Sequence, residues 1–162
     1  METYSRRTRI AAPLEEVWAF HSRIEGLEAL TPDFMSLEID EVRGPDGESE
    51  PDLLVEGSEI EMSLRPFGIA PRQRWVSRIT EREEREARAW FTDEMLDGPF
   101  PTWKHTHTFF ADGEETVIED RVEYELPLGP LKDVLGPLGV VGFEPMFRDR
   151  HKRTHEALES GQ

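Results

Sequence analysis

An alternation of apolar and polar residues with a period of two runs through the middle of the chain. It occupies residues 35–40, 59–65 and 72–79, continues in the segment REARAWFTDEM, and returns in the hairpin-like segment 103–127. A period of two places successive side chains on opposite faces of a strand, so that one face is buried and the other is exposed. With a shorter alternating segment at Thr3–Ile10, the pattern predicts a first strand followed by about six antiparallel strands.

Helical patterns flank the alternating region. The segment APLEEVWAFHSR places Pro13 at a helix start and two glutamates in the first turn, where they suit the helix dipole. The segment IEGLEALTP predicts a second short helix that ends at Thr31 and Pro32. From Pro145 onward, four residues at helical spacing share one face: Phe147, His151, Thr154 and Leu158.

The segment PLGPLKDVLGPLGVVG, residues 127–142, interrupts this order. It is apolar, but its glycines and prolines argue against a continuous helix before Pro145. The predicted order is therefore a strand, two short helices, an antiparallel sheet and a final helix. This order predicts the α+β class, with helix covering one side of the sheet, and residues 1–162 are long enough for one domain with a substantial core.

The hairpin brings polar groups to the inner face of the sheet. If its turn centres on the segment DGEE, His107 lies opposite Asp120, and Trp103 lies opposite Tyr124. The outer face then collects charged residues such as Lys104 and Glu123, so the histidines and the aspartate point inward. A buried polar group without a partner costs about 1–3 kcal/mol, and the simplest satisfied arrangement is a hydrogen bond between His107 and Asp120.

The inward group His105, His107, Asp120 and Tyr124 is compatible with three kinds of site. Two histidines and a carboxylate could bind a metal, although no fourth ligand is evident and no metal or other cofactor is expected. A His–Asp pair could act as acid and base, which makes His107, Asp120 and Tyr124 the candidate catalytic residues. The favoured alternative is the polar end of a binding cavity. Its predicted walls are Met62, Trp75, Phe91, Trp103 and Phe147.

The segment HKRTH places His151 and His155 four residues apart on the final helix. This spacing occurs in metalloprotease helices, but the glutamate of that motif is absent here. The segment is therefore expected to form an exposed or edge-packed helix face.

Composition narrows the choice of partners and compartment. Asp and Glu number 35 against 19 Lys and Arg, which gives a formal net charge of -16. Such a surface repels phosphate backbones and anionic lipid, so neither nucleic acid nor a membrane is an expected partner. Only three of the cations are lysine, a composition that a salt-rich cytoplasm favours because screening reduces self-repulsion. A protein that is merely acidic and soluble is the alternative.

Three further absences favour a cytoplasmic protein. The chain has no cysteine, which excludes disulfides and cysteine-bound zinc and fits a reducing compartment. It also shows neither an apolar run long enough to span a bilayer nor an apolar signal core near Met1.

Three segments of the chain resemble the START-like superfamily, also called the polyketide cyclase/dehydrase, Bet v 1-like or SRPBCC superfamily. They are the strand W-x-H-x-H-x-F, the strand D-x-V-x-Y-x-L-P-x-G and the N-terminal R-I-A-A-P-x-E-E-V-W-A-F. The resemblance implies a helix-grip fold, in which a curved antiparallel sheet wraps around a C-terminal helix and encloses an apolar cavity. It departs from relatives at GPLGVVGFEP, where they carry more continuous helix.

The resemblance also implies a function. Members bind lipids, sterols, polyketides or other hydrophobic molecules, and some are cyclases, aromatases or dehydratases. We therefore expect a cytoplasmic protein that binds a hydrophobic small molecule, such as a lipid, an isoprenoid or a polyketide-like compound. The alternatives are a cyclase or dehydratase that uses the same polar residues, and a protein-interaction module with a vestigial cavity.

Overall fold

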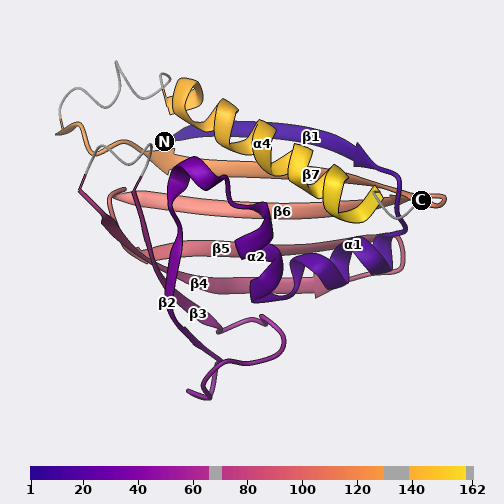
Figure 1. Ribbon diagram of the computed structural model, residues 1–162, viewed down its shortest axis with the longest axis horizontal. Helices are drawn as coiled ribbons and strands as arrows, with labels where there is room; N and C mark the ends of the chain where they lie inside the picture. Colours follow the sequence, from indigo (N-terminus) through magenta and orange to yellow (C-terminus); the bar gives the residue numbers. More distant parts are fainter. Residues whose placement is uncertain (66–70, 130–138, 160–162) are drawn as a thin grey trace.

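A computed structural model describes residues 1–65, 71–129 and 139–159 of the chain (Figure 1). Strand β1 (Glu2–Ile10) is followed by the helices α1 (Leu14–His21) and α2 (Ile24–Leu30) and by a short 3-10 helix, η1 (Asp33–Met35). The strands β2 (Glu38–Arg43), β3 (Glu59–Leu64), β4 (Gln73–Glu84), β5 (Arg88–Asp97), β6 (Thr102–Asp112) and β7 (Glu115–Glu125) follow, and α4 (Gly139–Glu159) comes last.

The seven strands form one antiparallel sheet in the order β1-β7-β6-β5-β4-β3-β2. The helices lie on one face of this sheet, and α4 runs across it near β1 and β7 (Figure 1). Register shifts between β4 and β5 occur at Val76/Ser77 and at Ile79/Glu81, and such bulges increase local bend and twist. The predicted α+β class and the helix-grip fold, with its curved sheet and two short helices after the first strand, are confirmed.

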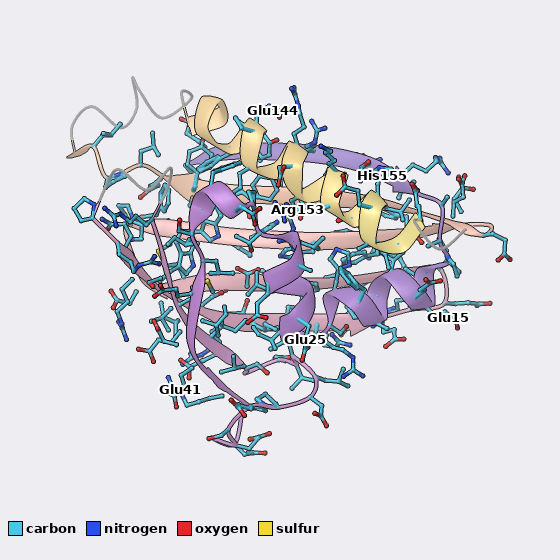
Figure 2. The ribbon with its side chains drawn as sticks, viewed as in Figure 1. Glu15, Glu25, Glu41, Glu144, Arg153 and His155 are labelled. Atoms are coloured by element: carbon cyan, nitrogen blue, oxygen red, sulfur yellow. The ribbon has the colours of Figure 1, made fainter. Side chains whose placement is uncertain are left out.

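The core consists of three apolar clusters on the helical face of the sheet. One joins Trp18 of α1 to Phe91 and Phe109, and another joins Val42 to Ile60 and nearby residues. The third lies under α4 and contains Tyr4, Trp103, Val122, Tyr124, Phe143 and Phe147. Charged side chains such as Glu15, Glu25 and Glu41 point away from these layers (Figure 2).

The predicted register of the β6–β7 hairpin is confirmed. His107 pairs with Asp120, His105 pairs with Val122, and Trp103 pairs with Tyr124. The inward residues are buried, whereas Lys104 is exposed on the opposite face. Parity therefore determined which side chains enter the interior.

Two predicted boundaries were wrong. Helix α4 begins at Gly139 and carries Pro145 inside it, although a helix start near Pro145 was predicted. The ring of Phe143 packs against Tyr124 with centroids 4.7 Å apart, and tertiary packing of this kind offsets the poor propensity of the segment. Residues 130–138 of the glycine- and proline-rich segment lie outside the described residues.

The second boundary concerns the strand that was predicted from residue 35. Residues Asp33–Met35 form the 3-10 helix η1 instead, and β2 begins at Glu38. Pro32 precedes the 3-10 turn, and Ser36 ends it in the left-handed region at φ 49°. The alternating pattern in this region therefore combined a turn with a strand.

Within the described chain, no helix combines the length and the apolar character that crossing a membrane requires.

Candidate functional site

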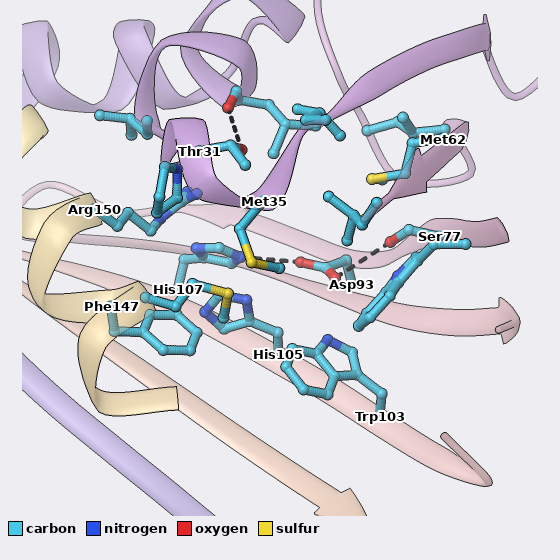
Figure 3. Close-up of a pocket in the computed structure, with 18 of the residues that line it drawn as sticks. Thr31, Met35, Met62, Ser77, Asp93, Trp103, His105, His107, Phe147 and Arg150 are labelled. Atoms are coloured by element: carbon cyan, nitrogen blue, oxygen red, sulfur yellow. Dashed lines mark hydrogen bonds and ion pairs between the residues drawn. The ribbon is translucent and has the colours of Figure 1, made fainter. Parts of the chain in front are cut away.

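A pocket of about 480 Å³ lies between the sheet and the helical layer (Figure 3). Its residues come from α1, α2, η1, α4 and the strands β3 to β6. Most of the lining is apolar, and its larger side chains include Leu27, Met35, Met62, Trp75, Phe100 and Trp103. The polar residues of the lining are therefore few and individually informative.

A row of polar side chains crosses the sheet side of the pocket. Ser77 of β4, Asp93 of β5, and His105 and His107 of β6 all line it. Asp93 and His105 are direct cross-strand partners, and His107 has the parity of His105 two residues further along β6. Figure 3 shows Asp93 between Ser77 and the histidines, bonded on both sides.

Hydrogen bonds connect this row in sequence. The hydroxyl of Ser77 donates to Oδ1 of Asp93 at 3.2 Å, and Nε2 of His107 donates to Oδ2 of Asp93 at 2.9 Å. The ring of His107 stacks on Phe91, with centroids 4.1 Å apart and planes at 14°. Since both polar and ring contacts fix His107, its orientation toward the pocket is well determined.

Asp120 of β7 lies behind this row, away from the pocket lining, and contacts both histidines of β6. Its Oδ1 lies 2.8 Å from Nε2 of His105 and 3.1 Å from Nδ1 of His107. Its Oδ2 accepts from Nε2 of His151, on α4, at 2.5 Å. Asp120 is 1 % exposed, and its carboxylate contacts three imidazoles. This one buried acid therefore connects strands β6 and β7 to helix α4 by hydrogen bonds.

This network sets the charges at the site. Burial alone would raise the pKa of Asp120, but the hydrogen bonds from three imidazoles hold that pKa well below its usual range. The same balance operates at Asp93, where burial is outweighed by the bond from His107 and the pKa is lowered. Both carboxylates are therefore ionised near neutral pH.

The pKa values of the two histidines of β6 shift in opposite directions. Burial would lower the pKa of His107, but the bonds to Asp120 and Asp93 raise it above its ordinary value. Burial lowers the pKa of His105, and the neighbouring charge of His107 lowers it further. At a pH between their two pKa values, His107 is thus the imidazolium of the pair and His105 the neutral ring, although the ring centroids lie only 3.6 Å apart.

A third histidine of the lining, His21 on α1, is held neutral. Burial lowers its pKa to about 3, helped by the positive charge of Arg150. Its Nδ1 donates to the carbonyl oxygen of Val17 at 2.8 Å. This ring contributes polarity to the pocket without charge.

The predicted site residues fall into two groups. The structure places seven of them on the pocket lining: Met62, Trp75, Phe91, Trp103, His105, His107 and Phe147. Asp120 and Tyr124 are not on the lining. Asp120 lies behind the histidines, and Tyr124 is fully buried in the cluster under α4 with Trp103 and Phe143.

Sequence reasoning missed several polar residues of the site. Asp93 could have been found, because it stands two residues after the inward Phe91 and shares its parity. His151 was predicted to lie on an exposed or edge-packed face, and this was wrong: it is 3 % exposed and bonded to Asp120. It shares a helical face with Phe147, which was the available indication.

Among the described residues, one group of side chains has metal-ligand character: Asp93, His105 and His107. Their potential ligand atoms lie within 4.8 Å of one another. However, Nε2 of His107 and Oδ2 of Asp93 already bond each other, so a metal would have to replace that hydrogen bond. The carboxylate of this group is Asp93, not the Asp120 considered from sequence.

The profile of a family described as "Polyketide cyclase / dehydrase and lipid transport" matches residues 10–148. No match was found among curated proteins.

Solved structures resemble the fold over almost the whole chain. The protein TTHA0849 from Thermus thermophilus is 19% identical, with 99% of each chain covered and a TM-score of 0.69. Norcoclaurine synthase from Thalictrum flavum, in complex with dopamine and hydroxybenzaldehyde, is 19% identical, with 98% of this chain and 87% of that chain covered and a TM-score of 0.63. A protein from Arthrobacter aurescens is 14% identical, with 98% and 86% covered and a TM-score of 0.67.

Proposed function

The chain belongs to the polyketide cyclase/dehydrase and lipid transport family, and on that premise we propose that its pocket binds a hydrophobic small molecule. The ligand is a lipid, an isoprenoid or a polyketide-like compound. Residues 1–162 act as one START-like domain in the cytoplasm, without a nucleic-acid partner. The observation that carries the proposal is the apolar pocket between the sheet and the helices, crossed by one row of bonded polar side chains.

Size and lining both support this proposal. A volume of about 480 Å³ falls within the range of small-molecule pockets, which is roughly 300–1,000 Å³. Such pockets combine apolar walls with a few placed polar groups that orient the ligand. Trp75 and Trp103 supply aromatic wall, and Ser77 and the two histidines of β6 supply orientation.

The norcoclaurine synthase structure supports a small aromatic molecule as one type of occupant. That protein is in complex with dopamine and hydroxybenzaldehyde, and it shares the fold of this chain. The alternative of an interaction module has less support. The large apolar side chains exposed among the described residues are Met1, Leu53 and Leu96, from three different segments. An interaction module would present them as a contiguous patch.

Native mass spectrometry of the purified protein tests the proposal. We expect an additional non-covalent mass that disappears when the protein is denatured. If the protein is purified empty, 1-decanol, farnesol and 2-naphthol serve as probes. A wild-type protein that carries no additional mass and binds none of the three probes contradicts the proposal.

Two matched variants locate the binding. Leu64→Trp places an indole at the pocket lining and should abolish the complex, because it fills space that the ligand requires. Leu96→Trp makes the same substitution at an exposed position outside the lining and should bind like the wild type. Equal binding by both variants would place the ligand elsewhere.

A second candidate function, a cyclase or dehydratase, is favoured by one observation. The imidazolium of His107 and the neutral ring of His105 both line the pocket, so an acid and a base are available side by side. Incubation of a bound ligand followed by mass analysis separates the two functions. An enzyme changes the ligand mass or its chromatographic retention, and His107→Gln should then lose conversion while the apolar walls of the pocket still bind the ligand.

A further inference from the structure

Arg150 of α4 lines the pocket, and no group of the described protein pairs with its guanidinium. Figure 3 shows its side chain directed from α4 toward the pocket, on the side of Thr31 and His107. Within residues 1–65, 71–129 and 139–159, the guanidinium forms neither a hydrogen bond nor an ion pair. The hydroxyl of Thr154 donates a hydrogen bond to the backbone oxygen of Arg150, which leaves the guanidinium free. A cation therefore faces an apolar space without a counter-ion.

Neighbouring cations of the same helix are paired. Nη2 of Arg148 lies 3.4 Å from Oε1 of Glu144, and Nε of Arg153 lies 2.6 Å from Oδ2 of Asp149. Arg153 also reaches Asp33, at 3.3 Å. The lack of a carboxylate partner thus sets Arg150 apart from these neighbouring arginines on α4.

The two carboxylates closest to the pocket are occupied by other donors. Both oxygens of Asp120 are bonded to imidazoles, and the oxygens of Asp93 accept from Ser77 and His107. These acceptors are therefore committed, and the five donors of a guanidinium remain available on the pocket side.

We propose that the ligand is an amphiphilic carboxylate, whose carboxylate pairs with Arg150 and whose apolar part lies along Trp75, Phe100 and Trp103. The inference rests on the proposed function, since it names the class of ligand for the same pocket. A guanidinium matches a carboxylate with two parallel hydrogen bonds, and such pairs are stronger away from bulk water.

Position on the lining supports this orientation. Arg150 and His21 both line the pocket, and the positive charge of Arg150 adds to burial in lowering the pKa of His21. His21 is uncharged, so it offers a polar neighbour to the head group without competing for it. The aromatic side chains Trp75, Phe100 and Trp103 form one contacting group, with the rings of Trp75 and Trp103 4.9 Å apart between centroids.

The test compares two probes that differ only in the head group. Decanoate and 1-decanol have the same apolar chain, and at about pH 7.5 decanoate is ionised. Isothermal titration of the wild-type protein should show decanoate binding about tenfold or more tighter than decanol. Equal affinities, or tighter binding of decanol, overturn the carboxylate inference while leaving the proposed pocket function intact.

Two variants assign the head group to its arginine. Arg150→Gln should weaken decanoate binding about tenfold or more and leave decanol binding nearly unchanged. The control Arg148→Gln removes an exposed arginine of the same helix, outside the lining, and should change neither affinity. Circular dichroism checks that both variants fold; should Arg150→Gln not fold, Arg150→Lys retains the charge but loses the planar pair and should weaken decanoate binding selectively.

The remaining outcomes separate the two levels of the proposal. If neither decanoate nor decanol binds the wild type, the pocket function itself fails. If decanoate binds but Arg150→Gln and Arg148→Gln weaken it equally, the attraction comes from general charge and the assignment to Arg150 is overturned.

Discussion

Asp120 of β7 and His151 of α4 come from opposite layers of the fold, and Oδ2 of the carboxylate lies 2.5 Å from Nε2 of the imidazole. The other oxygen of Asp120 contacts His105 and His107 on the neighbouring strand. Under the helix, Phe147 packs against the ring of His105, with centroids 5.2 Å apart. The position of α4 over the pocket is therefore held by a polar contact as well as by aromatic packing.

Removing the carboxylate should destabilise the whole protein. Asp120→Asn leaves three buried imidazoles with one amide oxygen in place of two charged oxygens. We expect a loss of about 3 kcal/mol in the free energy of unfolding, because a broken buried ionic network leaves its partners unpaired. Urea denaturation followed by circular dichroism measures this loss.

The matched control is the adjacent Glu119, which pairs with Arg7 on the outer face of the sheet. Glu119→Gln should cost less than about 1 kcal/mol, as exposed ion pairs usually do. Similar losses for the two variants would show that the network under α4 is no more important than a surface pair.

The charge of His107 should depend on its bond to Asp93. In the folded protein we expect this ring to remain protonated above pH 6.5, since its pKa is raised, whereas His105 becomes neutral first. Asp93→Asn removes a charged acceptor and should lower the pKa of His107. Nitrogen chemical shifts of the imidazole rings, followed by NMR over a pH titration, measure both effects.

Asp97→Asn serves as the control for this titration. Asp97 lies at the exposed end of the same strand and pairs with Arg74, so its loss should leave His107 unchanged. Titration of His105 above His107, or no response to Asp93→Asn, would contradict the charge assignment.

Stability should fall in mild acid because of His21. Its pKa is about 3 in the folded protein against an ordinary value of 6.5, so the unfolded chain binds a proton that the folded protein excludes. The contribution is fully present above pH 6.5 and is lost as the pH falls toward 3, at up to about 1.4 kcal/mol per pH unit.

His21→Phe removes this proton uptake and preserves an aromatic ring beside Phe109, which lies 4.8 Å from His21 between centroids. Between pH 6.5 and 4.5 the variant should lose less stability than the wild type, as measured by urea midpoints. Identical pH dependence of the two proteins would mean that His21 is protonated in the folded state.

Salt should stabilise the protein beyond ordinary ionic strength. A formal net charge of -16 repels itself in the compact state, and added ions screen that repulsion. We expect Tm to continue rising as KCl is increased above about 0.15 M. Sorbitol at the same osmolality is the control for solvent exclusion, and a flat Tm in KCl would favour a merely acidic protein over one adapted to high salt.

Part of this site could be predicted from the local pattern of apolar and polar residues. The hairpin from β6 to β7 has a short turn, so the parity of His107 and Asp120 followed from counting residues. The position of Asp93 depends on the register between β5 and β6, which the break at LDGPFP does not fix by counting. The positions of His151 and Arg150 could not be predicted by counting residues, because they depend on how α4 crosses the sheet.

The prediction of where α4 begins was wrong for a related reason. Propensity alone argued against a helix through Pro145, but Phe143 and Phe147 are four residues apart and reach Tyr124 and Tyr4 only from a helix. These aromatic contacts stabilise the helix only when the sheet that carries the two tyrosines has formed. Long-range packing therefore set the element that the sequence pattern described least well.

The sheet is open and ends in β1 and β2. Among the described residues, the outer side of β1 pairs with no strand, and that of β2 forms an isolated bridge between Arg43 and Ser49. Edges of this kind are templates for strand addition by another chain, which leads to aggregation. Strand β1 carries Arg6, Arg7 and Arg9, and β2 carries acidic residues and a register shift between Ile39 and Glu41. These features oppose the growth of the sheet from one molecule into the next, so the open sheet that forms one wall of the pocket is protected against polymerising.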